Sequence, residues 1–104
     1  MEISFEYNVL EKLNEVLDPE LGLGIRDLGL IYRVVANENV KSITVDMTLT
    51  TPNCPMSEML PEMARERLKG SFPDWNTYLN VVWTPAWTPD RINESGRQLL
   101  GMKS

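Results

Sequence analysis

Hydrophobic side chains near the start of the chain recur every three or four residues, the period of a helix with one buried face. Between positions 5 and 17 they are Phe5, Val9, Leu10, Leu13, Val16 and Leu17. Ser4 precedes this run, and its hydroxyl can accept a free backbone N–H of the first turn. The step Asp18-Pro19 follows, and the residue before a proline is pushed out of the α conformation. We therefore predict a helix over 5–17 and then a loop.

The next two segments have the pattern of strands joined by a turn. Residues 30–36 are rich in β-branched side chains, and residues 42–50 alternate between hydrophobic and polar. Asn37, Glu38 and Asn39 supply a polar turn, so we predict a hairpin. Its second strand should bury one face and leave the other partly polar. The buried set is expected to be Ile43, Val45, Met47 and Leu49, opposite Ser42, Thr44, Asp46 and Thr48.

Helical spacing returns after Pro55 and continues to Gly70, a suitable helix terminator. Pro61 lies either in the first turn of a helix that starts late or at a kink in one that starts at Pro55. A third strand is predicted over 78–84. Thr88-Pro89-Asp90 combines a capping residue, a first-turn proline and a first-turn acid, which predicts a C-terminal helix ending at Gly101.

This order of elements predicts one α+β domain spanning residues 1–104. Its architecture should be a two-layer sandwich, a small three-stranded mixed sheet with helices packed on one face. Helix and strand patterns must then share one core. Besides the four hydrophobic residues of the second strand, that core is expected to contain Phe5, Leu13, Met59, Met63 and Trp83.

Charge and residue usage exclude several classes of function. The chain has 15 acidic and 10 basic residues, a net charge of −5, which disfavours binding to nucleic acid. No hydrophobic run approaches the roughly 20 residues of a membrane span, and an acid follows Met1 where a signal peptide has bases. We therefore expect a cytoplasmic protein. There is one cysteine and no histidine, which excludes an internal disulfide and the Cys-His and Ser-His pairs of nucleophilic catalysis.

The single cysteine, Cys54, lies between a predicted strand and a predicted helix, in the run Thr50-Thr51-Pro52-Asn53-Cys54-Pro55. The positive end of a helix dipole lowers the pKa of a thiol and favours the thiolate, the form that binds metals and attacks electrophiles. The neighbouring threonines and asparagine supply polar groups, and the prolines stiffen the loop. A buried cysteine with no chemical role fits the spacing equally well.

Two further groups of residues are candidates. Asp18, Glu20 and Asp27 are loop carboxylates that could complete a metal site or receive a partner's cation, although ordinary turn chemistry also explains them. Trp83 and Trp87 either fill the core and its rim or, if exposed, mark a partner surface.

Four ordered blocks resemble the SufT/PaaD-like metal–sulfur cluster biosynthesis domain family, and the resemblance extends over nearly the whole chain, from about Val9 to Gly101. The blocks are residues 18–22, 25–32, 47–55 and 82–90. The chain departs from the family pattern at Asn53, where glycine is usual, and at Pro61, which falls inside a family helix.

The resemblance implies an iron–sulfur cluster assembly or protein-maturation factor centred on Cys54. It also implies that Asp18, Glu20, Thr50 and Thr51 line the same site. The expected partners are iron–sulfur assembly proteins and apo client proteins. A relative with extra C-terminal cysteines serves a ring-hydroxylating oxygenase of phenylacetate degradation, and their absence here favours the assembly role.

One cysteine cannot hold a cluster alone, because clusters need about four ligands. Transient binding of iron or of a cluster at Cys54 would need a homodimer, a partner's ligands or small thiols. A thiol-dependent enzyme, with Cys54 as nucleophile and Asp18 or Glu20 as acid or base, is an alternative, although such enzymes usually have a histidine. An interaction module that docks through its tryptophans is a third hypothesis.

Overall fold

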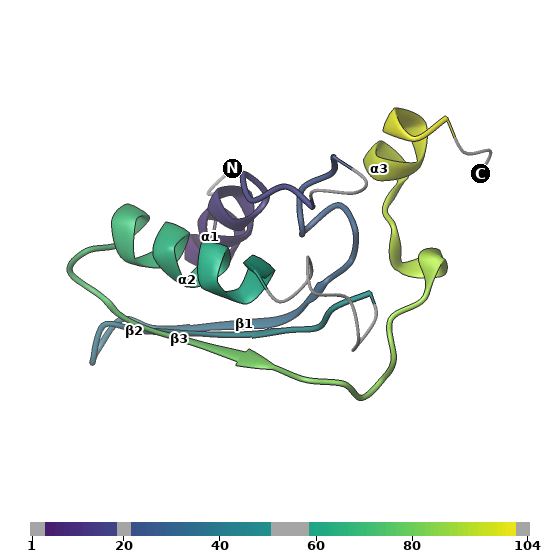
Figure 1. The fold of residues 1–104 in the computed structure, drawn as a ribbon. Helices are drawn as coiled ribbons and strands as arrows, with labels where there is room; N and C mark the ends of the chain where they lie inside the picture. Colours follow the sequence, from purple (N-terminus) through teal and green to yellow (C-terminus); the bar gives the residue numbers. More distant parts are fainter. Residues whose placement is uncertain (1–3, 19–21, 51–58, 102–104) are drawn as a thin grey trace.

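The computed structural model describes residues 4–18, 22–50 and 59–101. The elements, in chain order, are α1 (Phe5–Leu13), β1 (Ile31–Asn37), β2 (Ser42–Met47), α2 (Met59–Ser71), β3 (Asn76–Val81), a 3-10 turn η1 (Pro89–Arg91) and α3 (Glu94–Leu99). Helices α1 and α2 lie on one face of the sheet, and α3 lies beyond one end of it (Figure 1). The predicted two-layer α+β fold is confirmed.

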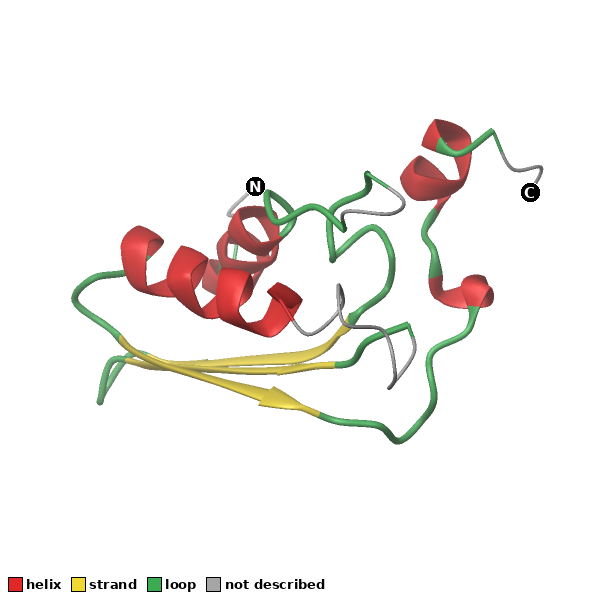
Figure 2. Cartoon of the chain, in the orientation of Figure 1, coloured by secondary structure: helices red, strands yellow, loops and turns green. Residues whose placement is uncertain are grey.

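The sheet is mixed, as predicted, with strand order β1-β2-β3. β1 and β2 form an antiparallel hairpin, whereas β2 and β3 are parallel. A parallel pair needs a crossover connection, and α2 supplies it above the strands (Figure 2). With these directions, the start of β1 and the ends of β2 and β3 all lie at the same end of the sheet.

The core lies between the two helices and the facing side of the sheet. In β2, Ile43, Val45 and Met47 are completely buried while the polar residues between them are partly exposed, so the predicted register is confirmed. Leu49 is also buried, as predicted. Thr48 departs from the prediction because it too is completely buried. The strand ends at Met47, so its alternation does not extend to Thr48.

Helix α2 is rotated relative to the prediction. Met59 and Met63 were expected in the core but are 56% and 41% exposed. The buried side of α2 consists instead of Leu60, Pro61, Ala64 and Leu68. Three of these have a spacing of four residues, so they form one row along the helix, and each methionine lies one residue, about 100°, away from that row. Pro61 falls in the first turn of the described helix, where its missing N–H costs no helical hydrogen bond.

Helix α1 is capped as predicted, but it ends earlier. The Ser4 hydroxyl accepts a hydrogen bond from the Tyr7 amide at 3.2 Å. The helix stops at Leu13 instead of residue 17, with Asn14 as its C-cap. The proline after Asp18 therefore does not end it. Phe5 is only partly buried, stacked on Trp75 with ring centroids 4.5 Å apart, rather than fully in the core as predicted.

The C-terminal third also differs from the prediction. β3 ends at Val81, three residues before the predicted end, so the chain has left the sheet at Trp83. Trp83 was expected in the core and is 47% exposed. The predicted single helix after Thr88 is a 3-10 turn followed by a separate α3. Thr88 makes no side-chain cap bond, whereas the Asn93 side chain accepts one from the Gly96 amide at 2.8 Å.

Candidate functional site

Three segments far apart in the sequence meet where the strands end at the right of Figure 1, and we call residues 22–30, 48–50 and 82–91 together the loop end. Two backbone hydrogen bonds join them. The Thr48 amide donates to the Leu30 carbonyl and the Val82 amide to the Met47 carbonyl, both at 2.8 Å. The directions of the strands impose this meeting, because β1 starts where β2 and β3 finish.

Side chains fasten the C-terminal segment to the start of β1. The Trp87 indole N–H donates to the Leu28 carbonyl at 2.6 Å, and the Tyr32 hydroxyl donates to the Pro85 carbonyl at 2.8 Å. The Arg91 guanidinium lies 4.6 Å from the centre of the Tyr32 ring. Trp87 therefore has a rim position with its polar N–H satisfied, one of the two roles that the sequence left open for it.

Asp27 has a structural role at the loop end. Its carboxylate accepts hydrogen bonds from the side-chain amides of Asn93 at 2.7 Å and Asn14 at 3.1 Å. The backbone carbonyl of Asp27 accepts a third hydrogen bond, from the backbone amide of Asn93 at 2.9 Å. Asp27 thus joins the end of α1, the loop before β1 and the start of α3. Both carboxylate oxygens are occupied by amide donors, which favours the structural explanation over a metal ligand.

A glycine allows the closest approach within the loop end. Gly29 has φ of +77°, and a Cβ there would lie 2.2 Å from the Arg91 carbonyl oxygen. A side chain at this position would both strain the backbone and force η1 away. Residue 29 therefore sets how closely the C-terminal segment packs on the loop before β1.

Asp18 lies in the turn that leads into the loop end and is only 4% exposed. Its amide donates to the Leu23 carbonyl and its carbonyl accepts from the Gly22 amide, both at 2.8 Å. Asp18 also makes a further interaction. The two backbone hydrogen bonds hold the turn, and they do not pair the carboxylate, whose burial without any partner would be very costly. Its burial was not apparent from the sequence, where it looked like a solvated turn residue.

Thr50 borders a small hydrophobic pocket at the loop end. The pocket has a volume of about 280 Å³ and is lined by Leu49, Thr50, Trp83, Ala86 and Trp87. Trp83 leaves nearly half of its surface exposed here. The sequence analysis predicted that a tryptophan, if exposed, would mark a partner surface. Trp83 is exposed at this pocket, and its contact with a partner stays a prediction.

Sequence reasoning missed the burial of Thr48, the first residue of the loop-end segment 48–50. Its hydroxyl is completely buried and has no hydrogen-bond partner within the described part of the chain. Burying an unpaired hydroxyl costs free energy, so such groups are rare in folded proteins. The alternating pattern of β2 placed Thr48 on the exposed face and gave no signal of this burial.

Three predicted site residues, Glu20, Thr51 and Cys54, lie outside the described residues. Their placement beside Asp18 and Thr50 stays a prediction, and so does the position of the thiol at the start of α2. Within the described ranges, no group of three or more His, Cys, Asp or Glu side chains could hold a metal ion. In those same ranges, no helix is both long enough and hydrophobic enough to cross a membrane.

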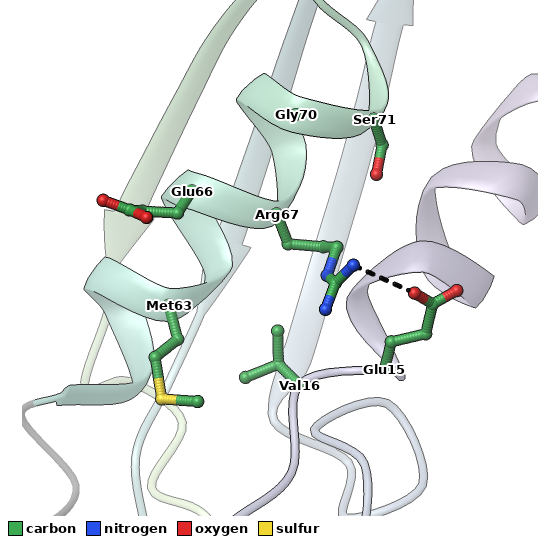
Figure 3. A pocket seen from close by; sticks show the side chains of 7 residues that line it. All are labelled: Glu15, Val16, Met63, Glu66, Arg67, Gly70 and Ser71. Carbon is green, nitrogen blue, oxygen red and sulfur yellow. Dashed lines mark ion pairs between the residues drawn. The ribbon is translucent and has the colours of Figure 1, made fainter.

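A larger pocket lies between the end of α1 and one flank of α2 (Figure 3). It has a volume of about 470 Å³ and is crossed by an ion pair between Arg67 and Glu15 at 3.2 Å. Val16, Met63, Glu66, Gly70 and Ser71 complete its lining. Its lining contains none of the predicted site residues. The larger of these two pockets is therefore not the one beside the predicted site.

Comparison with known proteins identifies the family. Residues 6–77 match the family described as iron–sulfur cluster assembly protein. The chain is 41% identical over 88 residues to the Fe-S protein maturation auxiliary factor SufT of Staphylococcus aureus (strain USA300), covering 84% of this chain and 98% of that protein. It is 33% identical over 104 residues to the Fe-S protein maturation auxiliary factor YitW of Bacillus subtilis (strain 168), covering 99% of this chain and all of the relative.

A solved structure agrees with this assignment. The crystal structure of the domain of unknown function DUF59 from Bacillus anthracis superimposes with a TM-score of 0.85 at 34% identity, covering 95% of this chain and 93% of that one. Sequence and fold thus match over nearly the same residues, and the resemblance found in the four sequence blocks is confirmed. The chain belongs to the iron–sulfur cluster assembly protein family.

Proposed function

We propose that this chain acts in the maturation of iron–sulfur proteins through the thiol of Cys54, presented at the loop end. Its role in iron–sulfur assembly or maturation rests on its family and on the relatives named above. The observation that supports the cysteine-centred mechanism is that three segments meet at the end of β2, next to residues 48–50, from which the chain continues to Cys54.

The chemistry of the thiol suits this task. A thiolate is a soft ligand that binds iron, and a cluster needs about four such ligands. One cysteine therefore supplies a single ligand to a cargo that the partner protein, or a second copy of this chain, holds with the others. Such incomplete ligation favours transfer of iron or of a cluster over permanent storage.

The neighbouring residues would tune and orient that thiol. Hydroxyl groups that donate to a thiolate stabilise its charged form, and we assign this role to Thr50 and Thr51. The carboxylate of Glu20 would receive a cation from the partner, while the buried Asp18 would hold the turn before the loop end in position. The pocket beside Thr50, with its exposed Trp83, is suited to contact a partner protein at the same place.

We infer that the partners are iron–sulfur assembly proteins and apo client proteins, and that they are met in the cytoplasm. A homodimer that pairs two Cys54 thiols would supply two of the ligands needed. Size-exclusion chromatography with light scattering, with and without iron and sulfide under anaerobic conditions, measures whether such pairing accompanies cluster binding.

Rescue of an iron–sulfur enzyme in cells that lack the native protein tests the proposed function. Cys54→Ser should abolish rescue, because the change keeps the size of the side chain but replaces a soft sulfur ligand with a protonated oxygen. Asp18→Asn and Glu20→Gln should weaken rescue without abolishing it. The measurement is the activity of the enzyme in cell extracts.

Two controls make this rescue experiment decisive. Thermal melting of each purified variant separates loss of function from loss of fold, because only a folded variant that fails to rescue supports the proposal. Asp74→Asn is a matched change at an exposed carboxylate outside the loop end and should rescue fully. Full rescue by folded Cys54→Ser would overturn the cysteine-centred mechanism and favour the interaction module.

A further inference from the structure

The sheet has two edges, and β3 forms one of them. The Asn76 amide donates to the Lys41 carbonyl and the Val82 amide to the Met47 carbonyl, both at 2.8 Å. In a parallel pair, alternate residues direct their backbone groups to the neighbouring strand. The amides and carbonyls of Thr77, Leu79 and Val81 therefore face the open side of β3. A row of such groups is a template for pairing with another strand.

A groove runs along this edge between β3 and one flank of α2. Its volume is about 270 Å³, and its lining is Arg65, Leu68, Lys69, Thr77, Tyr78, Leu79 and Asn80. Arg65 reaches across it and donates from Nη2 to the Leu79 carbonyl at 3.3 Å. Arg65 also pairs with Glu62, an exposed residue one turn earlier on α2.

The groove is positively charged in a chain that is acidic overall. Its two charged lining residues, Arg65 and Lys69, are both cations, whereas the net charge of the chain is −5. The opposite edge of the sheet, formed by β1, differs both in charge and in the regularity of its strand pairing. The pocket beside β1 is lined by Glu6 and Glu38, and the β1 ladder is interrupted by a register shift after Ile31. Regular pairing geometry and positive charge thus coincide at β3.

We propose that the β3–α2 groove binds an extended segment of a partner protein that alternates acidic and hydrophobic residues, by adding it as a fourth strand. Strand addition takes its affinity from main-chain hydrogen bonds and its specificity from alternate side chains. Acidic side chains on the α2 side of the segment would meet Arg65 and Lys69. Hydrophobic side chains on the other face would pack beside Tyr78, which is 54% exposed.

Without a bound segment, the Arg65 side chain occupies the Leu79 carbonyl on the open side of β3. A carboxylate of the incoming segment replaces Glu62 as the partner of Arg65, and this movement frees the Leu79 carbonyl to join the new ladder. A second copy of this chain is a poor occupant, because pairing two β3 edges would bring the Arg65 and Lys69 side chains of both copies together. The groove makes no use of Cys54, so this proposal is independent of the cysteine-centred mechanism.

Binding of a labelled peptide, acetyl-Val-Glu-Val-Glu-Val-Glu-Val-amide, to the full chain tests the proposal by fluorescence anisotropy. We expect saturable binding that Lys69→Glu weakens about fivefold or more, since one close charge pair is reversed. Arg67→Glu is the matched control, because it makes a similar charge change on the opposite flank of α2. Equal weakening by both variants would contradict the proposal and indicate attraction to overall charge alone.

Two N-methylated versions of the peptide test main-chain pairing separately from charge. One carries N-methyl groups on the valines and the other on the glutamates, so each removes the amide donors from one edge of the extended peptide. Strand addition predicts that one version loses binding while the other keeps it. Equal binding by both would overturn the proposal.

Further measurements exclude the other occupants. Amide NMR shifts on peptide binding should concentrate in residues 76–81 and on the flank of α2 that carries Arg65 and Lys69. Concentration-dependent self-association, with the same amide shifts appearing as the chain is concentrated without peptide, would instead identify a second copy as the occupant and overturn the partner segment. Cys54→Ser should bind the peptide normally, so failure here and failure of the cysteine-centred mechanism are distinguishable.

Discussion

The helix-covered half of the molecule and the loop end are built in different ways. Under α1 and α2 the described buried side chains are hydrophobic. The described buried polar side chains are Asp18 and Thr48, the first in the turn before the loop end and the second within it. Buried polar groups cost stability unless they are paired. Both regions bury hydrophobic side chains, including Leu28 and Leu30 of the loop end, but the loop end and the turn before it also keep buried polar groups that a purely stable fold would replace.

Removing a core side chain is the strongest test of this division. Leu13 is completely buried between α1 and the sheet, so Leu13→Ala should lower the free energy of unfolding by about 2–5 kcal/mol. The measurement is equilibrium unfolding in urea. Leu99→Ala, at a side chain that is 72% exposed, is the control and should change it by less than about 0.5 kcal/mol. A core variant no less stable than this control would contradict the division.

The Asp27 network gives a smaller expected effect, because it holds the loop end and not the core. Asp27→Ala removes the acceptor of two side-chain amides and should cost about 1–2 kcal/mol in the free energy of unfolding. Hydrogen exchange should show faster exchange in α3 and little change in β2. Asp90→Ala, at an exposed carboxylate, serves as the control. Uniformly faster exchange throughout the sheet would mean that the two regions do not unfold separately.

The Thr48 hydroxyl should contribute nothing to stability. Thr48→Val keeps the shape of the side chain and removes a buried hydroxyl with no partner among the described residues. We expect the free energy of unfolding to stay the same or to rise by up to about 1 kcal/mol. The same variant should reduce rescue of an iron–sulfur enzyme if the hydroxyl serves the site. Loss of more than about 1 kcal/mol would show that this hydroxyl is structural.

The fold was predictable where one regular spacing of hydrophobic residues determines which side chains are buried. Alternation in β2 gave the correct buried face because Ile43, Val45 and Met47 pack under helices along the whole strand. In α2 the same approach found the helix but not its orientation. Met59 and Met63 fit the broad hydrophobic stripe, yet the narrower row of Leu60, Ala64 and Leu68 faces the sheet.

The loop end was harder to predict because contacts between distant residues shape it. The end of α1 at Leu13 depends on Asn14, whose side chain hydrogen-bonds to Asp27, thirteen residues later. The exposure of Trp83 depends on where β3 leaves the sheet. Neither leaves a periodic signal. The candidate site was found through its sequence motif, and the motif gave no information on the burial of Asp18 and Thr48.

Iron–sulfur enzyme activity measured against the amount of folded protein tests the central claim most directly. Cells that lack the native protein would carry Cys54→Ser or Leu13→Ala, with folded protein quantified by thermal melting and immunoblotting. We predict that Leu13→Ala loses activity only in proportion to its loss of folded protein. Cys54→Ser should lose nearly all activity at an unchanged melting temperature. Full activity from folded Cys54→Ser would contradict the proposal that function resides in the thiol of Cys54.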